Sequence, residues 1–295
     1  MPLVVPGMVN SICYHYSDKA DADCGNDCGG TGFLIFRKSP KDGKDHYYAI
    51  TNRHVIDDGF PIIRINSLDG GNPHILELPK ENWVFHKQGA DVAAAYLVNS
   101  EKYDFEGINS IHILNKEDLD PQDIHAPSAI MYGSEVFMIG HFAKSPGLKR
   151  NRPVLRLGTV AQFPDSEELI TYDENIAPQE AYLVEMHSID GFSGSPVFHI
   201  SIGMQSFLSV STILESVYKI TAPEFNWEPN DRPINVIGID AGAFVPRRKV
   251  EIRDGDSYLG TNYEVKTPSG FSIVIPSWKI KELLLQPELA PRNNC

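Results

Sequence analysis

Short alternating runs of apolar and polar residues, separated by glycines, prolines and acidic residues, dominate this chain. Alternation with a period of two is typical of β-strands that bury one face. Convincing helices are fewer, and no repeat or low-complexity stretch is visible. The pattern therefore predicts a mostly β protein, with strands in the segments Gly32–Phe36, Tyr47–Thr51, Pro61–Ile65, Val92–Val98, Val136–Ile139, Tyr182–Met186 and Val236–Ile239.

One helix is predicted near the C-terminus, at about residues 277–286. Apolar residues alternate with charged ones over Trp278–Leu285, and Pro276 stands just before the segment. Proline close to the first turn is a common start signal for a helix. The composition agrees with this picture, because 23 glycines and 21 prolines suit many strands joined by turns, and an apolar content of 42% suffices for a buried core in 295 residues.

Three polar residues in distant segments are candidates for nucleophilic catalysis. Ser193 lies between two glycines in Gly191–Pro196, while His54 follows one predicted strand and Asp91 precedes another. A serine hydroxyl is a poor nucleophile at neutral pH, so hydrolysis by serine needs a histidine base and a carboxylate that orients it. The intervals between the three residues are long enough for each to come from a different part of one folded domain.

The order His54, Asp91, Ser193 separates the known classes of serine hydrolase. An α/β-hydrolase has the order Ser, Asp, His, but the histidine that follows Ser193 is His199, which is too near and is expected in the same strand. A subtilisin-like order needs a carboxylate well before His54, whereas Asp45 is close to it. The order found in chymotrypsin fits without such difficulty.

The segments around these residues resemble those of trypsin-like peptidases of the chymotrypsin fold, particularly the HtrA-like branch, although no PDZ-type domain follows. The resemblance covers most of the chain. Its motifs follow the order of the family, in Gly29–Ile35, Ala49–Ile56, Gly133–Gly140, Leu157–Val160, Val236–Gly242 and Phe271–Ser277 with the helix after it.

The resemblance implies an all-β fold of two packed six-stranded antiparallel barrels with the active site between them and a C-terminal helix. We place the boundary near residue 122, because acidic residues and prolines interrupt the apolar pattern within Glu117–Pro127. Residues 1–122 then form the barrel that carries the histidine and the aspartate. Residues 123–295 form the barrel that carries the serine, with the closing helix.

Each candidate residue has an expected role in a serine endopeptidase that works through an acyl-enzyme. Ser193 attacks the scissile carbonyl of a protein or peptide substrate, and His54 accepts its proton and passes it to the leaving amine. Asp91 holds the imidazole in the required tautomer. The backbone N–H groups of Gly191 and Ser193 are expected to form the oxyanion hole, and Gly191 suits this role because glycine can adopt the necessary backbone angles.

The specificity pocket is predicted from position relative to Ser193. His187 is expected at the base or wall of the pocket, and the strand residues Asp240, Ala241 and Gly242 are expected to line it. A carboxylate there favours Arg or Lys on the amino side of the scissile bond, because a desolvated cation needs a countercharge. We hypothesise that preference. As an alternative, a protonated His187 would neutralise Asp240 and leave a polar pocket, or would favour an acidic side chain.

One departure from the family concerns how the site is activated. Phe192 stands where trypsin-type enzymes have the aspartate that binds the new amino terminus after zymogen cleavage. A site built directly on folding, or gated by loop ordering, is therefore expected, and we hypothesise a regulatory protein partner. The segment Ser201–Pro233 is longer than the usual turn and is interpreted as a long hairpin, a lid or a partner-binding element.

The alternative function is a latent or catalytically silent protease-fold binding protein that is activated by, or serves, a partner.

Charge and hydropathy exclude several classes of partner. A net charge of −13 argues against direct binding of nucleic acid, and the basic clusters Lys149–Arg152 and Arg247–Lys249 are interpreted as solvated loops. No stretch approaches the roughly 20 apolar residues of a membrane span. The segment Met1–Val9 lacks the basic region and the long apolar run of a secretory signal.

The four cysteines favour a cytoplasmic location. Secreted trypsin relatives carry disulfides beside the catalytic histidine and serine, whereas no cysteine lies near those positions here. Cys24 and Cys28, with Cys13 and His15 upstream, lack a convincing second pair of zinc ligands. We therefore expect free thiols in a surface loop, no metal and no cofactor.

Overall fold

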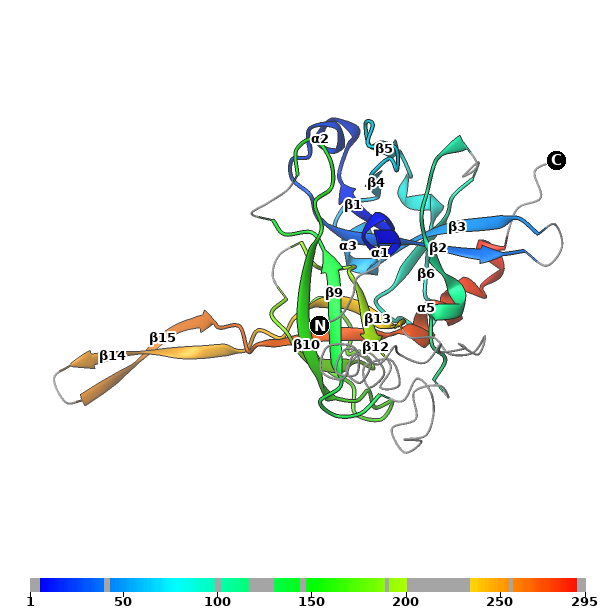
Figure 1. The fold of residues 1–295 in the computed structure, drawn as a ribbon. Coiled ribbons are helices and arrows are strands. Elements are labelled where there is room, and N and C mark those ends of the chain that lie inside the picture. The colour runs from blue at the N-terminus through cyan, green and yellow to red at the C-terminus, as the bar shows by residue number, and fades with distance from the viewer. Residues whose placement is uncertain are drawn as a thin grey trace, which may run out of the picture.

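The computed structural model describes residues 6–39, 43–98, 102–116, 130–143, 147–188, 191–200, 234–254 and 257–290. Strands dominate it, and its helices are short (Figure 1). In chain order the elements are α1 (Pro6–Asn10), β1 (Ile12–Tyr16), α2 (Lys19–Cys24), β2 (Gly30–Lys38), β3 (Asp45–Thr51), α3 (Arg53–Asp57), β4 (Ile62–Ile65), β5 (His74–Leu76), η1 (Lys80–Asn82), β6 (Trp83–Phe85), β7 (Ala93–Tyr96), β8 (Ile108–Asn109), η3 (Ser110–His112), β9 (Glu135–Gly140), β10 (Val154–Gln162), β11 (Tyr182–Glu185), β12 (Pro196–Ile200), β13 (Ile234–Ala243), β14 (Arg247–Asp254), β15 (Ser257–Lys266), β16 (Phe271–Pro276), α5 (Ser277–Leu284) and η5 (Pro287–Leu289).

The predicted strands and the closing helix are confirmed. The seven apolar runs correspond to β2, β3, β4, β7, β9, β11 and β13, and α5 covers most of the predicted helical segment. The divide predicted within Glu117–Pro127 lies outside the described residues, as does the long segment Ser201–Pro233.

The second half of the chain forms a closed antiparallel barrel in the order β10-β11-β16-β13-β12-β9. Side chains such as Val136 and Met138 fill its interior. Phe137 and Ile139, which point to the other face of the same strand, pack into a cluster shared with β1, β2 and β3. Burial on both faces explains why this strand is a continuous apolar run rather than an alternating one.

The first half forms a curled sheet in the order β5-β4-β1-β2-β3-β7-β6, with β8 parallel beside β2. Within the described residues its edge strands β5 and β6 are not paired with each other, so the sheet is a half-barrel rather than the expected closed barrel. Both edge strands are only 3 residues long and offer few ladder hydrogen bonds.

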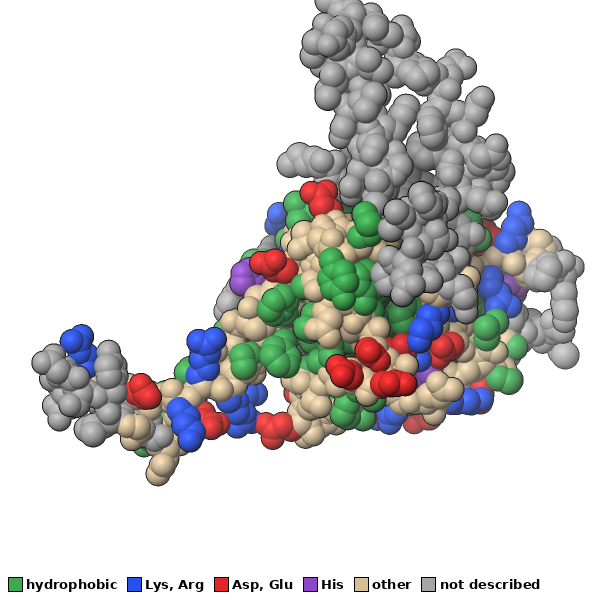
Figure 2. Space-filling model, turned by 90° about the horizontal axis from the view of Figure 1, so that it is seen from below, with side chains coloured by type: hydrophobic (Ala, Val, Ile, Leu, Met, Phe, Trp, Pro, Cys, Tyr) green, Lys and Arg blue, Asp and Glu red, His purple; other side chains and the backbone are tan. Residues whose placement is uncertain are grey.

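A two-stranded ribbon of β14 and β15 projects from the body (Figure 1). It prolongs the β13–β16 pair, because Phe244 N–H donates to Phe271 O at 2.9 Å and Thr267 N–H donates to Pro246 O at 3.1 Å. The interpretation of Arg247–Lys249 as a loop is wrong, since these residues begin β14. Figure 2 shows Lys and Arg side chains along this ribbon.

The cysteines differ in their surroundings. Cys13, Cys24 and Cys28 are free thiols. Cys13 is buried in β1, Cys24 is exposed at the end of α2, and Cys28 is half-buried with its thiol donating to Gly30 O at 3.2 Å. In the described ranges, no three His, Cys, Asp or Glu side chains gather as a metal-binding group. None of the described helices has the length and apolar character needed to cross a membrane.

Candidate active site

His54 lies in the first turn of α3, directly after β3 ends. Asn52, which precedes that helix, does not cap it with its side chain. Its Nδ2 instead donates to the backbone oxygen of Asp91 at 2.8 Å. The end of β3 and the start of α3 are thereby tied to the turn between β6 and β7 that carries Asp91.

Asp91 contacts His54 at two points. Its Oδ2 accepts a hydrogen bond from His54 Nδ1 at 2.7 Å, and its Oδ1 accepts the His54 backbone N–H at 3.0 Å. The carboxylate is only 3% exposed. Two contacts to one carboxylate fix both the position of the backbone and the orientation of the imidazole, which leaves Nε2 as the proton-accepting nitrogen.

The two groups shift each other's pKa in the directions that favour ionisation. Burial alone would raise the pKa of Asp91, but the hydrogen bonds and charge of His54 outweigh it and hold the pKa below its usual value. Burial alone would lower the pKa of His54, but the hydrogen bond and charge of Asp91 reverse that effect and raise it. The site therefore stabilises an imidazolium next to a carboxylate.

Two residues that the sequence did not indicate complete the surroundings of Asp91. The Tyr172 hydroxyl donates to Asp91 Oδ2 at 2.8 Å, and Gln179 Oε1 accepts the Asp91 backbone N–H at 3.0 Å. Gln179 also pairs through its backbone with Ile170, which closes the loop between β10 and β11. Burial and the nearby carboxylates raise the pKa of Tyr172, so its hydroxyl remains a donor. No motif marks either residue, because the contact depends on the path of that loop.

The turn that carries Ser193 is held by β2 of the other half. Thr31 N–H donates to Ser193 O at 2.8 Å, and Thr31 Oγ1 donates to Gly191 O at 2.7 Å. Gly191 and Gly194 have φ of 97° and 90°, in the region that favours glycine. A Cβ on Gly194 would lie 1.8 Å from Thr31 O, so this position has no room for any side chain.

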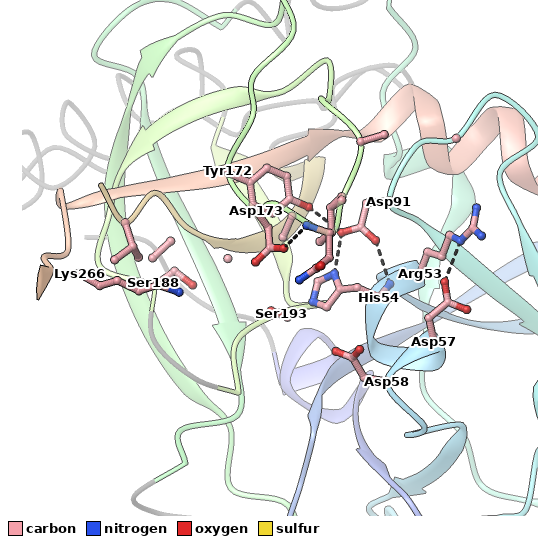
Figure 3. Close-up of a pocket in the computed structure, with 18 of the residues that line it drawn as sticks. Arg53, His54, Asp57, Asp58, Asp91, Tyr172, Asp173, Ser188, Ser193 and Lys266 are labelled. Carbon is pink, nitrogen blue, oxygen red and sulfur yellow. Dashed lines mark hydrogen bonds and ion pairs between the residues drawn. The ribbon is translucent and has the colours of Figure 1, made fainter. Parts of the chain in front are cut away.

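Ser193, His54 and Asp91 all line one cavity of about 1020 Å³. Ser193 lies on the side of the His54 ring away from Asp91 in the view of Figure 3. Among the described residues, no hydrogen bond joins Ser193 Oγ to His54 Nε2. The backbone N–H groups of Gly191 and Ser193 likewise have no acceptor within the described part of the chain, as an anion-binding pair requires.

The four residues predicted for the specificity pocket fall into two groups. Ala241 and Gly242 line the cavity, whereas Asp240 and His187 are absent from its wall. His187 is exposed elsewhere. Asp240 therefore offers no free carboxylate to a basic side chain in the cavity, and the hypothesis of a preference for Arg or Lys loses its structural basis.

The Asp240 carboxyl is instead a buried, hydrogen-bonded group behind that wall. It is 0% exposed, its Oδ2 accepts from Ser188 Oγ at 2.7 Å, and its Oδ1 accepts from Ser272 Oγ. Burial raises its pKa to about 6, although the two serine hydroxyls act in the opposite direction.

The chain matches no protein-family model and no curated protein. It is similar to the solved protease domain of MamO from Magnetospirillum magneticum in its apo form, with 10% identity and a TM-score of 0.51 over 95% of this chain and 99% of that chain. The active form of the Rv3671c protease from M. tuberculosis gives 15% identity and a TM-score of 0.46 over 95% and 82%. Neither likeness singles out the HtrA-like branch. The closed barrel, the curled half-barrel and the C-terminal helix together form a chymotrypsin-like protease fold.

Proposed function

We propose that the protein is a serine endopeptidase that hydrolyses protein substrates through an acyl-enzyme. Ser193 is the nucleophile, His54 the general base and acid, and Asp91 the carboxylate that orients the imidazole. The observation that carries the proposal is the double contact of Asp91 with His54, at 2.7 and 3.0 Å, in the cavity that Ser193 also lines.

The chemistry follows from these positions. Ser193 Oγ attacks the substrate carbonyl carbon while its proton passes to His54 Nε2, and Asp91 stabilises the resulting imidazolium. The N–H groups of Gly191 and Ser193 are suited to bind the oxyanion, because they have no acceptor among the described residues. When the C–N bond breaks, His54 returns the proton to the leaving amine, and water then releases the acyl group by the same steps in reverse.

A second candidate is a latent or silent protease-fold protein that binds a partner. The lack of a hydrogen bond between Ser193 Oγ and His54 Nε2 in the described residues favours this alternative. In active enzymes such bonds are often long before substrate binds, so the peptidase stays the leading proposal. A regulatory protein partner and a cytoplasmic location stay predictions from the sequence.

A fluorophosphonate probe tests the proposal, because it reacts covalently with an activated serine. We expect the purified wild type to be labelled, and Ser193→Ala and His54→Ala to lose the label. His46→Ala is a matched control, because His46 lies at the start of β3 and does not line the cavity. A folded wild type that resists labelling and does not cleave an unfolded, dye-quenched protein would support the latent alternative.

A further inference from the structure

The base of the ribbon carries four exposed cations in an acidic protein. Arg247, Arg248 and Lys249 begin β14 and Lys266 ends β15, and all four side chains are exposed. The whole chain, by contrast, has a net charge of −13. Figure 2 shows Lys and Arg side chains along the ribbon, with Asp and Glu side chains among them. We call these four residues the ribbon-base cluster.

The strand register of the cluster is unfavourable for the ribbon itself. Arg247 lies directly opposite Lys266, and like charges in that arrangement destabilise a strand pair. Arg247 forms an ion pair with Glu174 of the loop between β10 and β11. Within the described residues, no carboxylate forms an ion pair with Lys266. Glu174 offsets part of this repulsion, and a second anionic group beside Lys266 would offset more of it.

The other two cations differ in their surroundings. Arg248 is opposite Val265 and points to the other face of the ribbon from Arg247, because successive side chains of a strand alternate. Lys249 is opposite Glu264. In the part of the chain that the structure describes, neither cation is joined to a carboxylate in an ion pair. A two-stranded ribbon has little stability of its own, so a binding partner would also stabilise the ribbon.

The cluster begins where the candidate active site ends. Val245, Lys266 and Pro268 line the same cavity as His54 and Ser193. The base of the ribbon is fixed there, because it continues the hydrogen-bonded pair of β13 and β16. A ligand that fills the cavity and leaves it on this side must therefore pass the cluster.

The distance along the strand indicates which part of a substrate would meet the cluster. A Cβ on Gly242 would lie 3.9 Å from Ser193 Oγ, so this residue marks the site of attack. The stretch from Gly242 to Arg247 spans about 17 Å when extended. A polypeptide bound in extended form would reach the cluster at about four to six residues from the scissile bond.

On the side of α3 the cavity carries no excess of positive charge. Asp57, Asp58 and Arg53 line it there, and Asp57 is paired with Arg53 at 3.0 Å and with Lys80 at 2.7 Å. Among the described residues Asp58 forms no ion pair, whereas Lys266 lines the cavity on the side of the ribbon. Such an arrangement favours a ligand with acidic residues on one side only.

We propose that the ribbon-base cluster binds an acidic stretch of the polypeptide substrate, about four to six residues from the bond that is cleaved. The proposal rests on the proposed function, because it takes the ligand of the cavity to be a polypeptide. It deepens that function by naming a substrate class that the residues beside Ser193 do not select.

Binding to the inactive Ser193→Ala protein tests the proposal without turnover. The probe is a short fluorescent peptide with a block of glutamates flanked by glycine and serine, and the reference is the same peptide with glutamine in place of glutamate. Fluorescence anisotropy at low salt should show about tenfold tighter binding of the glutamate peptide, as a few surface ion pairs supply. The preference should disappear near 1 M salt, where charges are screened within about 3 Å.

Two triple variants with the same change in charge separate the cluster from the net charge of the protein. Arg248→Gln/Lys249→Gln/Lys266→Gln should lose the preference for glutamate. Lys149→Gln/Arg150→Gln/Arg152→Gln, in an exposed segment away from the ribbon, should keep it. Thermal unfolding verifies that both variants fold, and the double variant Arg248→Gln/Lys249→Gln serves if the first triple variant does not.

Three results would overturn the proposal. These are equal binding of the two peptides at low salt, equal losses in the two triple variants, and tighter binding of a single-stranded oligonucleotide of equal charge than of the glutamate peptide. Failure of the proposed peptidase function can be distinguished from failure of this proposal. Absence of fluorophosphonate labelling in the wild type, with the glutamate preference intact, contradicts the peptidase and leaves an acidic-peptide binding surface.

Discussion

The hydroxyl of Tyr172 donates a hydrogen bond of 2.8 Å to Oδ2 of Asp91, the same oxygen that accepts from His54 Nδ1 at 2.7 Å. A side chain from the second half of the chain therefore shares a carboxylate oxygen with the histidine of the first half. Both donors draw on the same negative charge. Removing one of them leaves more of that charge to the other.

Tyr172→Phe should lower kcat/KM roughly tenfold, the effect of losing one hydrogen bond to a charged group. It should also move the acidic limb of the pH–rate profile to higher pH, because Asp91 would then stabilise the imidazolium of His54 more strongly. A pH series with a peptide substrate measures both effects. Tyr132→Phe, at an exposed tyrosine away from the cavity, should change neither. A lower melting temperature with an unmoved acidic limb would assign Tyr172 a purely structural role.

Asp91→Asn should reduce kcat by about 10⁴-fold while the protein stays folded, as is typical when the orienting aspartate of a serine protease is replaced. The asparagine amide can donate to His54 Nδ1, which forces the proton onto Nε2 and removes the base. Asp57→Asn is the matched control, since Asp57 lines the same cavity but pairs with Arg53 and Lys80. Similar losses in the two variants would contradict the assigned role of Asp91.

Asp240→Asn should change how stability depends on pH. The folded pKa of Asp240, about 6, lies above the ordinary value of 3.8, so the folded protein holds this proton more tightly than the unfolded chain. The wild type should therefore lose stability as pH rises from about 4 to 6, by up to about 3 kcal/mol relative to the variant. Urea unfolding of both proteins between pH 4 and 7 measures the difference. A constant difference across that range would mean that Asp240 is ionised throughout.

Gly194→Ala should abolish fluorophosphonate labelling and destabilise the protein by several kcal/mol. The new Cβ would meet Thr31 O at 1.8 Å, in addition to the cost of a positive φ. Gly133→Ala separates the two effects, because Gly133 has φ of 80° but nothing within 4 Å of a Cβ. We expect a cost of about 1–2 kcal/mol for that control and normal labelling. Equal costs would show that the turn around Ser193 relaxes.

The sequence predicted those parts of the fold that depend on local burial. The apolar runs at Tyr47–Thr51 and Val136–Ile139 report burial of these segments, so both strands were found. The ribbon was missed because charged residues dominate Arg247–Asp254, and Val250 and Ile252 alone give too weak an apolar pattern to predict a strand.

The residues of the site likewise divide into those that the sequence predicted and those that it did not. The order of His54, Asp91 and Ser193 led us to expect that they converge, and the structure brings them to one cavity. The partnership of Tyr172 with Asp91 depends on how a loop of one half lies against the other, which no local pattern encodes. The side chain of Asp240 was placed in the pocket by strand position, but its neighbours Ser188 and Ser272 enclose it.

Hydrogen bonds from Thr31 connect the turn that carries Ser193 to the first half of the chain. Ser193 belongs to the closed barrel by covalent connection, yet the bonds from Thr31 to Ser193 O and Gly191 O, and from Thr51 Oγ1 to Thr31 O at 2.7 Å, fasten its turn to the strands that lead to His54. A hinge motion between the two halves cannot separate serine from histidine without first breaking these bonds. The positions of Ser193 and His54 relative to each other therefore depend on hydrogen bonds made by two threonines on neighbouring strands, β2 and β3.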